Sequence, residues 1–208
     1  MTSRAATGPE PAPLILASRS AGRAEVLRRA GIPFEAMPTA VDEAAVKAAM
    51  LAEAAPPRDI ADALAELKAQ RLAARMPDRL VLGADQVLVC DGRLYDKPQH
   101  LAEARAQLVA LRGRRHELLS AAVVYEAARP VWRHIGRAQL VMRAFSDHFL
   151  DAYLAAEGPD ALATVGAYRL EARGAQLFER VDGDIFTVMG MPLLPLLGFL
   201  RTRGICLE

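Results

Sequence analysis

The chain has 208 residues, of which 52% are hydrophobic; 26 basic and 25 acidic residues give a formal net charge of +1. This composition is typical of a globular protein and argues against a disordered one. A chain of this length can bury roughly 70% of its unfolded surface. The balanced charge and the 5% of aromatic residues argue against a basic, base-stacking nucleic-acid surface.

The two ends of the chain carry no recognisable export or membrane signal. Residues 1–13 lack an apolar h-region and are expected to form a flexible tail ahead of a single domain with two lobes at 14–208. The apolar run Met191–Leu200 contains a proline and is too short to cross a bilayer. Cys90 and Cys206 form no disulfide framework. We therefore expect a cytoplasmic protein without a membrane partner.

The first predicted unit is a short buried strand at Leu14–Ala17, a serine-rich turn, and a helix that continues to about Ala30. The turn brings Ser18, Ser20 and Arg23 close to the amino end of that helix. Free N–H groups and the helix dipole at such an end can bind an anion. The same serines can equally serve as simple helix caps. The turn alone leaves both interpretations open.

Two helices are predicted next. A loosely acidic, alanine-rich helix follows Val41–Glu43 and breaks at the Pro56-Pro57 pair. A second helix spans residues 59–75, with apolar residues at helical spacing. Lys68 lies beside this apolar stripe. Taken alone, such a residue is more often a surface lysine whose stem lies along an apolar face.

The most informative stretch is the apolar run Leu80–Cys90, which is predicted to be a buried strand and holds Asp85 near its middle. A buried ionised carboxylate costs several kcal/mol unless it is paired or binds a metal. The Asp91-Gly92 turn then returns the chain to Lys97. A carboxylate and an ammonium group in one site suit a metal-bound polyphosphate.

The remaining elements alternate between helix and strand. We expect a helix at 101–112, strands at 116–125 and 131–145, a helix capped by Ser146, a strand-like pair ending at 185–189, and a last helix that opens at Pro192. The sequence contains no glycine-rich Walker or dinucleotide-binding loop. The four histidines have no zinc-ligand spacing.

An ordered set of short motifs resembles the Maf family of nucleoside triphosphate pyrophosphatases. Each motif is weak, but together they cover about residues 14–202 in the family's order. They are Leu16–Arg23, Val41–Glu43, Leu64–Ala69, Gly83–Asp85 with Lys97-Pro98, Gly113-Arg114 with His116, Gly166–Tyr168, Gly183-Asp184 and Gly190–Leu193.

The resemblance implies an α/β fold, in which an elongated mixed β-sheet with flanking helices forms two lobes around a central cleft. It also implies metal-dependent hydrolysis of a nucleoside triphosphate to the monophosphate and pyrophosphate by a homodimer, with Mg²⁺ or Mn²⁺ as cofactor. The roles that it implies are proton acceptor for Asp85, catalysis and phosphate binding for Lys97, substrate binding for Ser18, Ser20, Arg23 and Lys68, and metal binding for Glu43 and Asp85.

Three positions that differ between branches of the family are Gly22, Gln86 and Glu171 in this chain. The last two resemble the 7-methyl-GTP branch, in which the first position is usually tryptophan. A carboxylate such as that of Glu171 can accept hydrogen bonds from a guanine and favours a methylated, positively charged base. A glycine at position 22 cannot provide the cation–π stacking that an aromatic residue would supply.

Two alternatives remain beside the 7-methyl-GTP hypothesis. One is a dTTP/UTP or broad-range pyrophosphatase of the same family that removes non-standard nucleotides. The other is a regulator of septum formation that binds nucleotides without catalysis, in which Lys68, Asp85 and Lys97 would form a structural ion network. Six polar positions from four separate segments favour an enzyme over such a network.

Overall fold

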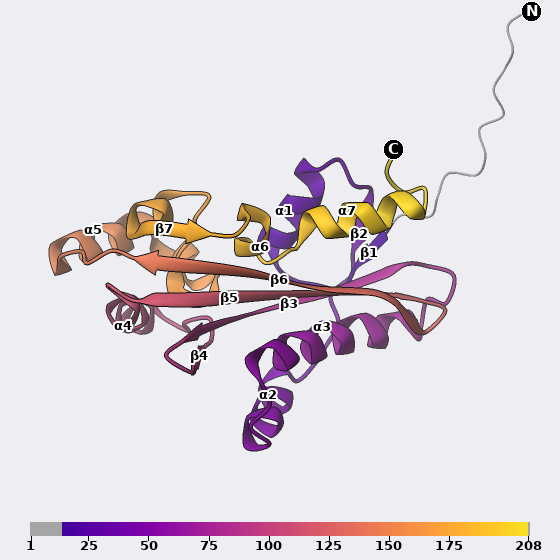
Figure 1. The fold of residues 1–208 in the computed structure, drawn as a ribbon, viewed down its shortest axis with the longest axis horizontal. Coiled ribbons are helices and arrows are strands. Elements are labelled where there is room, and N and C mark those ends of the chain that lie inside the picture. The colour runs from indigo at the N-terminus through magenta and orange to yellow at the C-terminus, as the bar shows by residue number, and fades with distance from the viewer. Residues whose placement is uncertain (1–13, 208) are drawn as a thin grey trace, which may run out of the picture.

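The computed structural model describes residues 14–207, so the tail expected at 1–13 lies outside the described residues, as does residue 208. The molecule is elongated, and one long mixed sheet carries helices on both faces (Figure 1). The predicted α/β class is confirmed. Within residues 14–207, the helices are too short or too polar to cross a membrane.

The sheet has seven strands in the order β2-β1-β3-β5-β6-β7, with β4 paired to β3 beside this path. The pairs β1–β2 and β1–β3 are parallel, and the remaining pairs are antiparallel. The strands are β1 Leu14–Leu16, β2 Phe34–Ala36, β3 Val81–Cys90, β4 Arg93–Tyr95, β5 Arg115–Glu126, β6 Arg129–Met142 and β7 Phe178–Asp182.

Seven α-helices and three 3₁₀ turns complete the described part of the chain. The helices are α1 Ala21–Arg29, α2 Glu43–Ala52, α3 Pro57–Ala73, α4 Leu101–Leu111, α5 Asp147–Glu157, α6 Ile185–Val188 and α7 Leu193–Thr202. The 3₁₀ turns are η1 Gly158–Leu162, η2 Val165–Ala167 and η3 Arg173–Leu177.

The prediction of a strand at 185–189 is wrong, because Ile185–Val188 form the short helix α6 and Met189 caps it. Thr187 lies in an apolar run that contains Ile185 and Val188 and so resembles a strand. Asp184 decides otherwise, since its carboxylate accepts hydrogen bonds from the Thr187 amide at 2.8 Å and the Thr187 hydroxyl at 2.6 Å. This cap satisfies a free amide at the start of a helical turn. Phe178–Asp182 is the strand in this region.

The apolar core is divided along the length of the sheet. At one end, two clusters cover opposite faces, one under α3 and one under α1 and α7. At the other end, a third cluster packs β5 and β6 against α4 and α5. We call these two ends of the elongated molecule in Figure 1 its lobes; the single two-lobed domain expected at 14–208 stays a prediction.

One edge of β3 is unpaired in its middle. Strand β5 pairs with β3 from Val81 to Val89, but on the opposite edge β1 reaches only Leu82, and β4 begins only at Leu88. Residues 83–87 therefore face no strand on that side, and we call this segment the open edge. The turn after β1 and the segment after β4 flank it, so its place in the sheet brings distant parts of the chain together.

Candidate functional site

The open edge carries a buried ion pair. Asp85 and Lys68 are both buried, and the Lys68 ammonium lies 2.7 Å from Asp85 Oδ1. The same ammonium lies 3.0 Å from Glu43 Oε1, whose side chain is 43% exposed. One lysine thus links a strand carboxylate to a carboxylate at the start of α2. The partnership explains how a charge is tolerated inside the apolar strand.

A glycine brings α3 close enough for this contact. A Cβ atom at Gly83 would lie 2.1 Å from the Ala65 carbonyl oxygen and 2.6 Å from the Ala69 amide, so no larger residue fits there. The α3 backbone therefore packs directly on the β3 backbone. Asp85 follows two residues later on the same face of the strand. Lys68, between these two alanines in sequence, can then reach it.

The Arg23 guanidinium is buried and has no carboxylate partner among residues 14–207. Its Nε donates to the Gly190 carbonyl oxygen at 3.0 Å, and a terminal nitrogen donates to Ser18 Oγ at 3.1 Å. Loss of hydration lowers the pKa of Arg23, while the more distant charges of Asp85 and Glu43 raise it. A buried cation whose hydrogen-bond partners are neutral oxygens is expected to be completed by an anion.

The serine-rich turn holds Arg23 in place. Ser20 caps α1, and its hydroxyl accepts a hydrogen bond from the Arg23 amide at 3.4 Å. Ser18 Oγ accepts both from the Ser20 amide at 3.2 Å and from the Arg23 side chain. The capping interpretation of this turn therefore holds, and the same serines orient a cation beside the amino end of the helix. Anion binding by the turn stays a prediction.

Lys97 follows β4 at the other end of the open edge, and its side chain is exposed. Its pKa is lowered by loss of hydration and by repulsion from Arg23 and Lys68, while Glu43 and Asp85 raise it. The mutual effects of these five groups indicate that three cations and two carboxylates converge at the open edge.

Gln86 points to the opposite face of the sheet from Asp85, as the alternation of a strand requires. Its amide nitrogen donates to Ser120 Oγ at 2.9 Å and to the carbonyl oxygens of Thr187 and Val188 at 3.0 Å each. The nitrogen is thus occupied by the protein, and Oε1 remains as an acceptor. Sequence reasoning had found Gln86 but not the buried Ser120 that orients it.

The other two predicted specificity positions differ in their placement. A Cβ atom at Gly22 would meet Met189 O at 3.7 Å and Ser20 Oγ at 3.8 Å, so there is room for a side chain beside the site. Glu171 is exposed on the turn after β6 and α5, where its charge acts on Arg169 and Tyr153. Among residues 14–207, Glu171 has no polar contact with the residues at the open edge.

The carboxylates at the open edge could hold a divalent cation together with phosphate. Glu43 and Asp85 each offer one oxygen to Lys68, which leaves the second oxygen of each for another partner. Within the described residues, no three His, Cys, Asp or Glu side chains form a complete metal cage. This donor set fits Mg²⁺, which commonly uses one or two carboxylates and completes its shell with phosphate oxygens and water.

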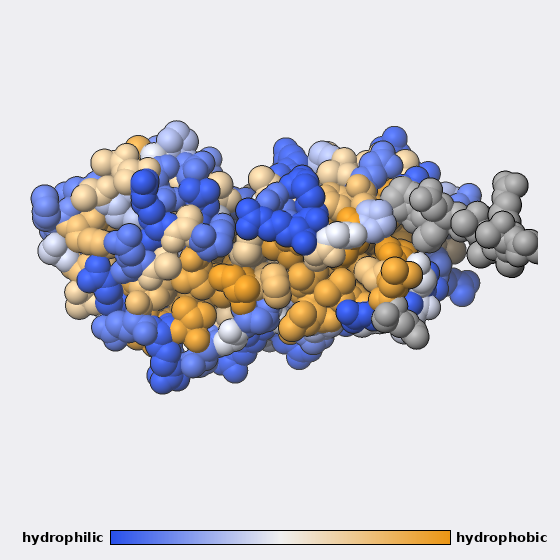
Figure 2. All heavy atoms as spheres, turned by 90° about the horizontal axis from the view of Figure 1, so that it is seen from above, coloured by the Kyte–Doolittle hydropathy of each residue, from blue (hydrophilic) through white to orange (hydrophobic). Residues whose placement is uncertain are grey.

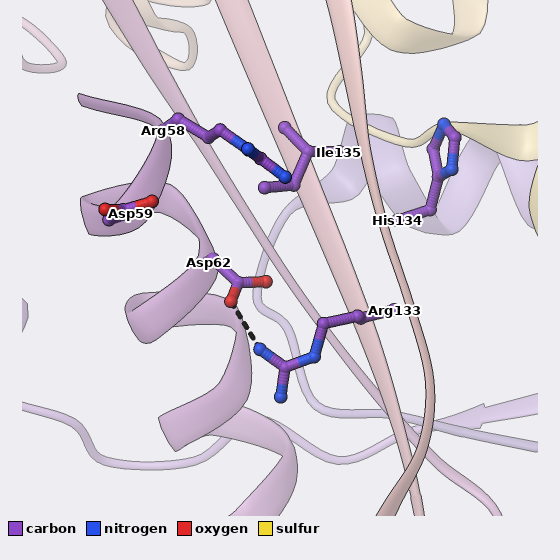
Figure 3. Close-up of a pocket in the computed structure, with 6 residues that line it drawn as sticks. All are labelled: Arg58, Asp59, Asp62, Arg133, His134 and Ile135. Carbon is purple, nitrogen blue, oxygen red and sulfur yellow. Dashed lines mark hydrogen bonds and ion pairs between the residues drawn. The ribbon is translucent and has the colours of Figure 1, made fainter. Parts of the chain in front are cut away.

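A separate pocket of about 370 Å³ lies between the start of α3 and β6, away from the predicted site residues (Figure 3). Arg133 in this pocket donates to Asp62 Oδ2 at 2.5 Å, whereas His134 points to the other side of the strand. Arg133 and Asp62 are paired with each other in this pocket, and Arg58 and Asp59 are exposed to solvent. The pocket therefore offers a ligand less than the open edge does, where the buried Arg23 makes no ion pair within residues 14–207.

Two further residues, which the sequence analysis did not single out, border the site. Lys47 on α2 forms an ion pair with Asp96, which directly precedes Lys97. The two residues are 49 positions apart, and neither belongs to a recognisable motif. Only the fold brings them together.

Comparisons with known proteins agree with this geometry. The family described as Maf-like protein matches residues 13–203. The nucleoside triphosphate pyrophosphatase of Ruegeria pomeroyi is 54% identical over 193 residues, which are 93% of this chain and 97% of that protein. The proteins of the same name from Granulibacter bethesdensis and Caulobacter vibrioides are each 51% identical, over 90% and 92% of this chain and 95% and 96% of their own lengths.

Proposed function

This chain belongs to the Maf-like family, and on that premise we propose that it is a hydrolase that cleaves a nucleoside triphosphate to the monophosphate and pyrophosphate. The observation that carries the proposal is Arg23, a buried cation whose hydrogen-bond partners are neutral oxygens. A triphosphate would supply the missing negative charge. Lys97, exposed at the other end of the open edge, supports the same conclusion.

The reaction needs a positioned water and charge compensation on the phosphates. Lys68 donates to Asp85 Oδ1, so Oδ2 is the oxygen that can take a proton from an attacking water. An ionised carboxylate has about four lone-pair sites, so one remains for the metal. Arg23 and Lys97 would neutralise the phosphate oxygens on either side of the scissile anhydride. No covalent intermediate on the protein is required, because water can attack the phosphorus directly.

We propose that Glu43 and Asp85 hold the divalent metal, Mg²⁺ or Mn²⁺. Such a metal would polarise a phosphoryl oxygen and stabilise the charge that develops during cleavage. Lys68 has a second role here, because it reduces the repulsion between the two carboxylates before the metal and nucleotide bind. Loss of activity on chelation, with recovery on addition of Mg²⁺ or Mn²⁺, is the expected result.

For the base, we propose 7-methyl-GTP or another modified purine nucleotide, with dTTP or UTP as the alternative. Gln86 supports this because its Oε1 is left as an acceptor, which suits a base that presents an N–H donor. Glu171 could accept from a purine only if the nucleotide or the turn brings the two together. The Gly22 position leaves space and offers no stacking surface.

We also propose that the protein is a homodimer. Figure 2 shows apolar residues gathered on one face, over the half of the molecule that holds α7. Leu194 and Ile185 lie on α7 and α6 and are 59% and 39% exposed. Contiguous exposed apolar surface often marks a protein interface. Sedimentation that finds only monomer at micromolar concentration would refute this part of the proposal.

The test of the activity is product release from a panel of nucleotides with Mg²⁺ or Mn²⁺. The panel contains the common triphosphates, 7-methyl-GTP and methylated pyrimidine triphosphates. We expect equal amounts of monophosphate and pyrophosphate, with the highest kcat/KM for 7-methyl-GTP. Preference for dTTP or UTP would refute the base assignment alone. Absence of turnover across the panel, with folded protein and metal present, would refute the enzymatic proposal.

A further inference from the structure

Helix α2 is weakly attached to the rest of the molecule. None of its residues is buried, and only Val46 and Met50 pack partly against the cluster under α3. In Figure 1 the helix extends away from the sheet below α3. Its position therefore depends strongly on polar contacts, and two of these contacts involve the groups at the open edge.

The two contacts come from one face of α2. Glu43 and Lys47 are four residues apart and so are neighbours on the helix surface. Glu43 reaches Lys68 on α3 at 3.0 Å, and Lys47 reaches Asp96 in the segment after β4. The helix thus connects the carboxylate that would hold the metal to the segment that carries Lys97.

The receiving segment is fixed from its other side. The Asp96 carbonyl oxygen accepts a hydrogen bond at 3.0 Å from the Gln107 side chain, which is buried on α4. Asp96 is therefore held through its backbone by α4 and through its side chain by α2. Because Lys97 is the next residue, any shift of Asp96 moves the start of the Lys97 side chain.

We propose that Lys47 and Asp96 are positioning residues that hold Glu43 and Lys97 at the separation a metal-bound triphosphate requires. The inference rests on the proposed function, and it adds a role for two residues that touch neither the phosphates nor the metal. The Asp96 side chain is 66% exposed, and pairs of this kind contribute little to folding stability. The contribution of this pair is instead to the geometry of the bound complex.

The kinetic test is a double-mutant cycle with Lys47→Met, Asp96→Asn and both changes together. We expect each single change to raise the nucleotide KM by about two- to fivefold with kcat nearly unchanged. The double variant should match the singles, because either change already breaks the pair. Lys47→Arg keeps the positive charge and should therefore have the nucleotide KM of the unchanged protein. The control is Asp151→Asn, which breaks the exposed pair with Arg105 away from the open edge.

A second measurement separates this inference from the proposed function. Hydrogen exchange of the α2 amides, without nucleotide, should speed up in Lys47→Met and Asp96→Asn and stay unchanged in Asp151→Asn. A wild-type protein without turnover would refute the proposed function and leave this comparison intact. An unchanged KM in an active enzyme, an additive double variant, or unaltered exchange in α2 would each overturn the inference.

Discussion

Two clusters of buried polar side chains lie on the same sheet and differ in charge. At the open edge, Arg23, Lys68 and Asp85 are buried as charged groups. In the other lobe, His116 Nε2 lies 2.8 Å from the Tyr168 hydroxyl, and both rings are buried. Burial lowers the pKa of His116 to about 4 and raises that of Tyr168 well above its usual value, so this pair is neutral near pH 7.

The comparison separates two uses of buried polarity. The neutral pair packs against Phe178, whose ring centroid is 4.7 Å from that of Tyr168. His116 Nε2 and the Tyr168 hydroxyl satisfy each other, whereas His116 Nδ1 has no hydrogen-bond partner among the described residues. Such a pair can serve packing alone. The charged cluster contains a cation, Arg23, that is not neutralised by an adjacent carboxylate, which is costly unless a ligand completes it. We therefore expect changes at the first cluster to alter turnover and changes at the second to alter stability.

Among the variants that leave Asp85 unchanged, the largest effect is expected for Arg23→Gln. The change removes the buried cation that would bind phosphate, and truncating one partner of a buried charge pair commonly costs 2 kcal/mol or more, so the nucleotide KM should rise about 30-fold or more. Arg133→Gln is the matched control, because Arg133 is paired with Asp62 and lies in the separate pocket. A KM that rises equally in both variants would contradict the phosphate role.

The next effect concerns stability and pH at His116. The unfolded chain binds a proton at this residue below about pH 6.5, whereas the folded protein does so only below about pH 4. Folding stability should therefore fall as pH drops from 6.5 to 4, by about 3 kcal/mol at most. Urea unfolding at several pH values should show this loss, and His116→Gln should remove that part of it.

Turnover of His116→Gln at pH 7 should stay close to that of the unchanged protein. The residue lies on β5 in the lobe that holds α4 and α5, beside Tyr168 of the third apolar cluster and beside Phe178. If this variant loses activity while it remains folded, the division between a functional and a structural cluster is wrong.

A smaller effect is expected for Lys97→Ala, which should lower kcat/KM by about tenfold because one exposed phosphate contact is lost. The pKa of Lys97 is lowered, so its charge disappears at a lower pH than that of a free lysine. Activity should accordingly fall on the alkaline side as pH rises through this pKa. Lys97→Arg should move that decline to higher pH; an unmoved profile would exclude Lys97 as its cause.

The smallest effect is expected for Glu171→Gln. The residue is exposed and remote from the polar contacts at the open edge, so the maximal rate should hardly change. If Glu171 contacts the base and favours 7-methylguanine, the kcat/KM for 7-methyl-GTP divided by that for GTP should fall by a few-fold. An unaltered ratio would remove Glu171 from the specificity positions.

Much of the architecture could be predicted from local patterns. The apolar run around Asp85, the Asp91-Gly92 turn and the helical spacing around Lys68 each indicated the correct element. Short segments were harder, because the apolar run around Thr187 resembles a strand, while the cap from Asp184 makes it a helix. A side-chain cap outweighs a four-residue pattern there.

The site was predictable only in part, for reasons of distance along the chain. The resemblance named Glu43 and Lys97, but the sequence offers no local signal that Lys47 meets Asp96 between them. Nor does the sequence reveal that the Gln86 side-chain amide donates a hydrogen bond to Ser120 Oγ. The first contact depends on where β4 leaves β3, and the second on the register of β3 with β5, which pairs Gln86 with Ser120; both are properties of the assembled sheet.

The most direct test compares the turnover of Asp85→Asn with that of Asp62→Asn, after both variants are shown to be folded. Each change removes a carboxylate that is paired with a cation. Asp85 lies on β3 and faces α3, and Asp62 lies on α3 itself. We predict that Asp85→Asn loses about 100-fold or more in pyrophosphate release, because the proton acceptor is gone, while Asp62→Asn remains active. Near-normal activity of Asp85→Asn, or an equal loss in both variants, would contradict the assignment of catalysis to the open edge.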